Sequence, residues 1–145
     1  MKASSNAVKF IKESEGLRLE AYKDPGDGTL TIGWGHTSGV KEGDRITQAQ
    51  AERFLQEDIR IVEDELKRQG LALNQNQIDA LVSLIFNIGI PQFRTSTILR
   101  RIKANPCDPD IRYQFSRWKY AGGKILPGLI RRRKEEADLY FKPTI

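Results

Sequence analysis

Two carboxylic acids and a hydroxyl group near the start of the chain have the types and spacing for acid–base chemistry. Glu15 falls at the end of a predicted helix, Asp24 at the end of a predicted strand, and Thr31 on the strand that returns. These adjacent elements would bring the three groups into one region. Hydrolysis of a glycosidic bond requires a protonated acid for the leaving oxygen and a second, ionised carboxylate that positions water or attacks the sugar. We therefore take Glu15, Asp24 and Thr31 as candidate catalytic residues.

Helical phase selects Glu15 rather than its neighbour Glu13. At about 100° per residue, Val8, Ile11 and Glu15 fall on one helix face, whereas Glu13 falls on the opposite arc. A carboxyl group on the apolar face loses water, and the end of the helix adds the negative end of its dipole. Both effects favour the protonated form that a general acid requires. The position is equally compatible with a side chain that bends into water or pairs with an arginine.

The other candidates also have ordinary structural explanations. Asp24 opens an Asp-Pro-Gly turn and, taken alone, is better explained by that turn than by catalysis. Thr31 suits a strand because it is β-branched. His36 is the only histidine, and a single ring without a partner is more typical of a structural role. The sequence has no cluster of His, Cys and spaced acidic residues, so we expect neither a metal nor a cofactor.

The candidate residues lie on the first elements of the chain. Residues 4–6 can cap a short helix that Gly16 ends. Residues 17–35 then alternate as strands should and contain the turn sequence DPGDG, so they predict a hairpin or small sheet.

From Thr47 onward, apolar residues recur with the spacing of α-helices. Thr47 and Gln50 fit a capping box, and the helix that they begin continues to Gly70. A second helix, capped near Asn74 and ended at Gly89, is apolar almost all round and predicts a central core helix. Shorter helices are predicted at about 96–104, 109–120 and 128–141.

One helix, a small sheet and then only helices predict an α+β fold of two unequal lobes. We expect residues 1–145 to form a single lysozyme-like domain with a β-hairpin in its small lobe, at about 13–50. A bridging helix at about 48–69 would join it to a larger helical lobe, formed by about 71–145 and the first helix.

Charge is unevenly distributed along the chain. The net charge is +5, with −3 in residues 1–89 and +8 in residues 90–145. The basic second part suggests a polyanionic partner, which charge alone leaves open among nucleic acid, a membrane surface and an anionic wall polymer. The single Cys107 excludes an internal disulfide and fits a reducing compartment. The first residues lack the apolar core of a signal peptide, and no later run is long and apolar enough to span a bilayer.

Three short segments closely resemble the phage-type lysozymes, glycoside hydrolase family 24. They are Glu15–Leu19 (EGLRL), Tyr22–Asp24 (YKD) and Thr31–His36 (TIGWGH), and the eight-residue gap from Glu15 to Asp24 also fits the family. The similarity continues through the helix from Thr47 and the segments Phe86–Gly89, Phe93–Arg100 and Trp118–Leu139. The resemblance therefore covers nearly the whole chain. The DPGDG turn is one residue longer than in well-studied members, which would shift Asp24 relative to Thr31.

The resemblance implies cleavage of the β-1,4 bond between N-acetylmuramic acid and N-acetylglucosamine in peptidoglycan, as in an endolysin that lyses a phage host. Glu15 would be the general acid, Asp24 the second carboxylate, and Thr31 a holder of the attacking water, in a cleft between the lobes. His36 would be structural, and one residue of Arg131–Arg133 would orient Glu15 or contact the wall polymer.

The same resemblance sets expectations for partners and location. We expect a monomer that binds peptidoglycan, with no nucleic acid and no stable insertion into a membrane. The protein would accumulate in the host cytoplasm and act on the wall after release. Its route to the wall would be a holin or an apolar anchor that has been removed.

Two alternative functions remain open at this stage. A lytic transglycosylase would use Glu15 alone, although the presence of Asp24 and Thr31 favours hydrolysis. A non-enzymatic cationic module would bind walls, membranes or nucleic acid through a helix at 128–141. Acidic residues follow the basic run in that helix closely, so docking on the helical lobe is favoured. The apolar contacts expected for this docking come from Leu129, Ile130, Ala137, Leu139 and Phe141.

Overall fold

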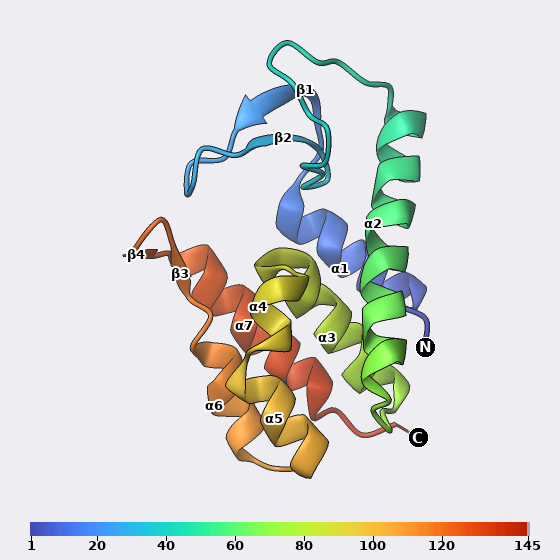
Figure 1. Ribbon diagram of the computed structural model, residues 1–145, viewed down its shortest axis with the longest axis vertical. Coiled ribbons are helices and arrows are strands. Elements are labelled where there is room, and N and C mark those ends of the chain that lie inside the picture. Colours follow the sequence, from blue (N-terminus) through green and yellow to red (C-terminus); the bar gives the residue numbers. More distant parts are fainter. Residues whose placement is uncertain (145) are drawn as a thin grey trace.

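A long helix, α2, runs along one side of the molecule and joins its two lobes (Figure 1). The computed structural model describes residues 1–144, and α2 spans Gln48–Gln69. The backbone N–H of Gln50 donates to the Thr47 hydroxyl, and the N–H of Thr47 donates to the Gln50 side chain, which confirms the predicted capping box. Gly70 ends the helix in the left-handed region, at φ +66°.

The small lobe contains an antiparallel hairpin of β1 (Arg18–Lys23) and β2 (Leu30–Gly33). Tyr22 lies opposite Thr31 in the pairing, and an irregularity interrupts the register nearer the start of β1. The hairpin predicted for residues 17–35 is therefore confirmed. β2 packs against α2, which ties the sheet to the long helix.

The first helix, α1 (Ser5–Glu15), belongs by its contacts to the helical lobe. Its cap residue Ser4 donates hydrogen bonds from both its backbone N–H and its hydroxyl to the carboxylate of Asp79 on α3. α1 packs against α3 and ends at Gly16, where φ is +71°. Glu15 is thus the last residue of a helix that is fixed to the helical lobe at its other end.

The core of the helical lobe is α3 (Gln75–Ile88), in which every residue from Gln77 to Ile85 is buried. It packs against α1, α2, α4 and α7, as its nearly continuous apolar surface predicts. The remaining elements are α4 (Ile90–Arg94), α5 (Thr97–Ala104), α6 (Asp110–Ser116), β3 (Tyr120–Ala121), β4 (Lys124–Ile125) and α7 (Pro127–Tyr140). Within residues 1–144, no helix combines the length and apolar character needed to cross a membrane.

The prediction of only helices after residue 47 is wrong at one place. The helix predicted at 109–120 ends at Ser116, and a second hairpin, β3–β4, follows it. Gly122 and Gly123 form its turn with φ +58° and +78°, a conformation that glycine adopts without steric cost. Strands of two residues are too short to show an alternating pattern, so the sequence signal was limited to the two glycines.

The turn of the second hairpin lies next to the turn between β1 and β2 (Figure 1), and the two approach each other closely at Gly122 and Gly26. A Cβ atom on Gly122 would lie 2.2 Å from the carbonyl oxygen of Gly26, in the turn between β1 and β2. A Cβ atom on Gly26 would lie 3.1 Å from the Cβ of Ala121. Backbone therefore meets backbone here, and glycine on both sides permits this close approach.

Candidate active site

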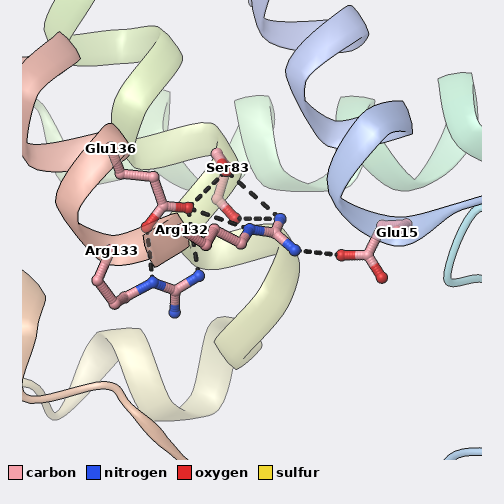
Figure 2. A network of polar contacts seen from close by, with 5 residues as sticks. All are labelled: Glu15, Ser83, Arg132, Arg133 and Glu136. Carbon is pink, nitrogen blue, oxygen red and sulfur yellow. Dashed lines mark hydrogen bonds and ion pairs between the residues drawn. The ribbon is translucent and has the colours of Figure 1, made fainter. Parts of the chain in front are cut away.

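Glu15 ends α1 with its carboxyl group turned toward α7 (Figure 2). Nη1 of Arg132 donates to Oε2 of Glu15 at 2.5 Å, and 17% of the Glu15 side chain is exposed. The carboxyl group is therefore mostly buried and paired with an arginine. The arginine pairing was one of the two environments that helical phase allowed. A guanidinium at this distance stabilises the ionised carboxylate, so burial and the helix dipole alone do not account for a general acid.

Two grooves border the region of Glu15. A groove of about 580 Å³ contains Glu15 in its wall, together with residues of α1, α7 and the end of α3 such as Asn87. A smaller groove of about 180 Å³ lies between the loop after β2, which includes Gly35, and the α3 residue Phe86. The backbone of Gly35 in turn approaches the Glu15 carboxyl group closely. The carboxyl group thus lies between the two grooves.

Asp24 forms the turn that its sequence predicted. Its Oδ1 accepts a hydrogen bond of 2.7 Å from the N–H of Gly26, and its own N–H donates to the carbonyl of Thr29. The N–H of Gly28 closes the turn on the Asp24 carbonyl. Among residues 1–144, Oδ2 has no protein hydrogen-bond partner, so one oxygen builds the turn and the other is left for a ligand or water.

Thr31 lies on the adjacent strand and is almost fully buried, with 3% exposed. Its hydroxyl donates to the carbonyl of Thr29 at 3.0 Å, which leaves the oxygen free to accept a hydrogen bond. Both Asp24 and Thr31 therefore contact Thr29, and the hairpin brings these two residues together.

Tyr22 connects the hairpin electrostatically with Glu15. Burial raises the pKa of the Tyr22 phenol, and the nearby carboxylates of Asp24 and Glu15 raise it further. Tyr22 thus lies within electrostatic range of both acids. Glu15 itself makes no direct hydrogen bond to Asp24 or Thr31 within the described chain.

His36 has the structural role that the sequence favoured. Its Nδ1 lies 2.8 Å from Oδ2 of Asp58 on α2, and its ring stacks on Phe54 with centroids 4.2 Å apart. It is 7% exposed. His36 therefore fastens the loop after β2 to the long helix and is not a catalytic candidate.

Sequence reasoning missed part of the surroundings of Glu15. It proposed one of Arg131–Arg133 without choosing, and the structure selects Arg132, which also bonds to Glu136 and Ser83 (Figure 2). Glu136 and Ser83 were not candidates. The spacing of four residues from Arg132 to Glu136 was the available signal, because such pairs share a helix face.

The fold of the chain matches those of solved muramidases and lysozymes. The muramidase domain of SpmX from Asticaccaulis excentricus superposes with a TM-score of 0.84 at 37% identity, over 98% of this chain and 99% of that chain. A crystal structure of a P22 lysozyme mutant gives a TM-score of 0.76 at 40% identity, over 98% and 99%. The fold and these neighbours define a lysozyme, a glycoside hydrolase that cleaves peptidoglycan. The family model described as phage lysozyme matches residues 12–136, and the chain belongs to this family.

Endolysins are its relatives in sequence. The endolysin of Acyrthosiphon pisum secondary endosymbiont phage 1 is 44% identical over 145 residues, covering 97% of this chain and 98% of that protein. The endolysin of Salmonella phage P22 is 42% identical, covering 94% and 97%. The endolysin of Bacillus phage PZA is longer, and the match spans 99% of this chain but 57% of that protein. The predicted family and the hydrolase activity are confirmed, and the transglycosylase and non-enzymatic alternatives are not favoured.

Proposed function

We propose that the chain hydrolyses the β-1,4 bond between N-acetylmuramic acid and N-acetylglucosamine, with Glu15 as the general acid. The observation that carries this role is the position of Glu15, whose carboxyl group lies between two grooves and remains partly accessible. A glycan strand lying along the grooves would pass the acid, which protonates the oxygen of the leaving sugar.

Asp24 and Thr31 are proposed to hold and activate the water molecule that attacks the sugar. The turn fixes Asp24 through Oδ1 and leaves Oδ2 without a protein partner among the described residues. The Thr31 hydroxyl, whose hydrogen points to Thr29, offers its lone pairs. A water molecule held by Oδ2 and by the Thr31 oxygen would be oriented toward the sugar carbon while Asp24 accepts its proton.

The biological setting follows from the same assignment. We propose a monomer that accumulates in the host cytoplasm and meets peptidoglycan after release, through a holin or after loss of an anchor. It would need neither nucleic acid nor stable insertion into a membrane. The net charge of +8 in residues 90–145 supports approach to an anionic wall polymer. Sedimentation of the purified protein as a dimer would contradict the monomeric state.

Replacement of Glu15 by glutamine tests the central role. Glu15→Gln keeps the shape of the side chain and removes the transferable proton, so clearing of purified peptidoglycan should fall at least about 100-fold, the typical contribution of a general acid. Circular dichroism and the melting temperature should show an intact fold. Turnover near that of the unmodified protein would refute the assignment.

Mass spectrometry of the digested wall separates the possible reactions. Hydrolysis produces fragments with reducing ends, whereas a transglycosylase produces anhydro-muramic ends. We expect reducing ends only. Killing of cells that persisted fully in the Glu15→Gln protein would instead support a non-enzymatic, membrane-directed activity.

A further inference from the structure

A buried group of charged residues lies behind Glu15. It consists of Arg132, Arg133 and Glu136 on α7, together with Ser83 on α3 (Figure 2). The two arginines are 6% and 1% exposed, and Glu136 is 1% exposed. Buried charges cost several kcal/mol each to desolvate, and apolar residues of similar volume often serve stability better. The retention of three such charges next to Glu15 therefore points to a role in the site.

Arg132 connects this group to Glu15. Its Nη1 donates to Glu15, its Nε donates to Oε2 of Glu136 at 3.3 Å, and its Nη2 donates to the carbonyl of Ser83 at 3.2 Å. All three nitrogens of the guanidinium are thus engaged. Because that group is planar and rigid, the contacts with Glu136 and Ser83 fix the direction in which Nη1 points.

Glu136 is in turn held in place by its neighbours. The hydroxyl of Ser83 donates to its Oε2 at 2.5 Å, and Nη2 of Arg133 donates to the same oxygen at 3.2 Å. Nε of Arg133 lies 2.7 Å from Oε1. Glu136 is therefore the common partner of both arginines, and Arg132 is the only one of the two that also contacts Glu15.

Glu136 offsets one of the two positive charges behind Glu15. Burial lowers the pKa of Arg133 to about 10, so Arg133 is still a cation at neutral pH. Burial raises the pKa of Glu136, and the two guanidinium groups and the Ser83 hydroxyl act against this by stabilising its anion. Without the anion, two positive charges would act on Glu15 from one side and would favour its ionised form.

We infer that Glu136 is a positioning residue for Glu15: it directs the Arg132 guanidinium toward the Glu15 carboxyl group and offsets the positive charge that would otherwise strip Glu15 of its proton. This inference rests on the proposed role of Glu15 as the general acid. It resolves the conflict between an acid that must be protonated and an arginine that contacts it. Arg132 holds the carboxyl group in place, and Glu136 limits the electrostatic cost of doing so.

Other charged and polar groups also lie near Glu15. Arg131 and Glu135 on α7 and Glu13 on α1 line the groove that contains Glu15. Tyr22, on the hairpin, lies within electrostatic range of both Glu15 and Asp24. From α3 come Asn87 and Ser83, which do not titrate. Within residues 1–144, Glu136 is the only carboxylate besides Glu15 that forms an ion pair with Arg132.

Glu136→Gln tests the inference through the pH dependence of wall hydrolysis. The variant removes one negative charge, so Glu15 should lose its proton at lower pH and the alkaline limb of the activity profile should move down. We expect a shift of about 1 to 1.5 pH units, the size of the interaction between unit charges about 8 to 12 Å apart at an effective dielectric constant of about 20. An alkaline limb that stayed in place would overturn the inference.

Glu65→Gln is the matched control. Glu65 is also 1% exposed and also pairs with two arginines, Arg94 at 2.6 Å and Arg68 at 3.6 Å, but it makes no contact with Glu15 or Arg132 in the described chain. Its replacement should cost stability and leave the pH profile unchanged. An equal shift in both variants would show a general effect of destabilisation and would contradict the inference.

The double variant Glu136→Gln with Arg133→Met tests the inference even if Glu136→Gln alone does not fold. It removes one charge of each sign from the buried group, which restores the balance, and apolar replacement of buried ion pairs is often tolerated. The alkaline limb should return to its original position. If Glu15→Gln is inactive while neither variant behaves as stated, the inference fails and the proposed acid stands. An active Glu15→Gln protein would contradict both the inference about Glu136 and the proposed role of Glu15 as the general acid.

Discussion

Gly35 faces the carboxyl group of Glu15 so closely that no side chain fits between them. A Cβ atom at position 35 would lie 2.6 Å from Oε1 of Glu15 and 3.1 Å from its Cδ. Gly35 also has φ +75°, which side chains rarely adopt. The backbone after β2 therefore forms one wall of the space that the acid occupies, opposite the arginine on α7.

Gly35→Ala should damage activity far more than stability. The added methyl group would displace the Glu15 carboxyl group by about 1 Å, and misplacement of that size can cost about 100-fold in rate. The backbone conformation adds a penalty of about 1–2 kcal/mol. Gly39→Ala is the control, because Gly39 has φ +70° but a Cβ atom at that position would meet nothing within 4 Å. Similar wall-clearing rates for the two variants would contradict the steric argument.

Gly122→Ala should separate the two hairpins. The new Cβ would lie 2.2 Å from the carbonyl oxygen of Gly26, well inside the normal contact distance of about 3.5 Å, so the turns must move apart. Spin labels on Thr29→Cys and Lys124→Cys, with Cys107→Ser, would report a longer distance by pulsed electron paramagnetic resonance, and activity should fall with it.

The control for that experiment is Gly123→Ala. Gly123 has φ +78° and no neighbour within 4 Å, so its substitution strains the same turn without touching Gly26. The distance between the labels should then remain that of the unmodified protein. An unchanged distance in Gly122→Ala as well would show that the hairpins are not in contact in solution.

Asp58→Asn should lower the free energy of unfolding by about 1–3 kcal/mol, measured by urea denaturation at pH 6. The change removes a charged partner from His36, whose ring is buried and stacked on Phe54. Glu20→Gln is the comparison, since the Glu20–Arg45 pair is 3.3 Å long and exposed. Pairs of that kind contribute at most about 1 kcal/mol. Equal losses in the two variants would argue against a structural role for the histidine.

We expect Tyr140 to make the free energy of unfolding decrease in alkaline solution. Its phenol is buried and donates to the carbonyl of Pro106, and burial raises the pKa of Tyr140. The unfolded chain releases this proton near pH 10 while the folded chain keeps it. The stability contribution is therefore complete below about pH 10 and decreases above it, by up to about 1.4 kcal/mol per pH unit.

Urea denaturation between pH 8 and 11 measures this slope. Tyr140→Phe should reduce it, although Tyr22 leaves a smaller remainder because its pKa is also raised. Replacement of the exposed Tyr113 by phenylalanine should leave the slope as it is. A slope that persisted unchanged in Tyr140→Phe would assign it to other groups.

The sequence predicted the elements whose signals are local. The capping box at Thr47, the cap near Asn74 and the glycines that follow these helices predicted their boundaries within about one residue of the observed ones. Helical phase chose Glu15 over Glu13, and the observed Glu13 is exposed whereas Glu15 is partly buried. Such signals depend on neighbouring residues only, so no knowledge of the tertiary structure was needed.

The surroundings of Glu15 depend on tertiary packing and were predicted only in part. Which arginine of a run of three reaches Glu15 depends on how α7 is rotated against α3. The apolar contacts expected from α7 included Ile130, which is 48% exposed, whereas Arg133 and Glu136 occupy the buried face. A helix that buries charged residues contradicts the rule on which hydrophobic patterning rests.

The two carboxyl groups of the proposed mechanism are carried by separate bodies. Glu15 is fixed to the helical lobe, because α1 is tied to α3 through Ser4 and Asp79, whereas Asp24 sits in the turn that meets the second hairpin at Gly122. Retaining and inverting glycosidases differ in the separation of their acids, about 5–5.5 Å against about 6.5–9.5 Å. We expect this separation to depend on how closely the two hairpins approach, so the contact between Gly122 and Gly26 would help to set the anomeric configuration of the product.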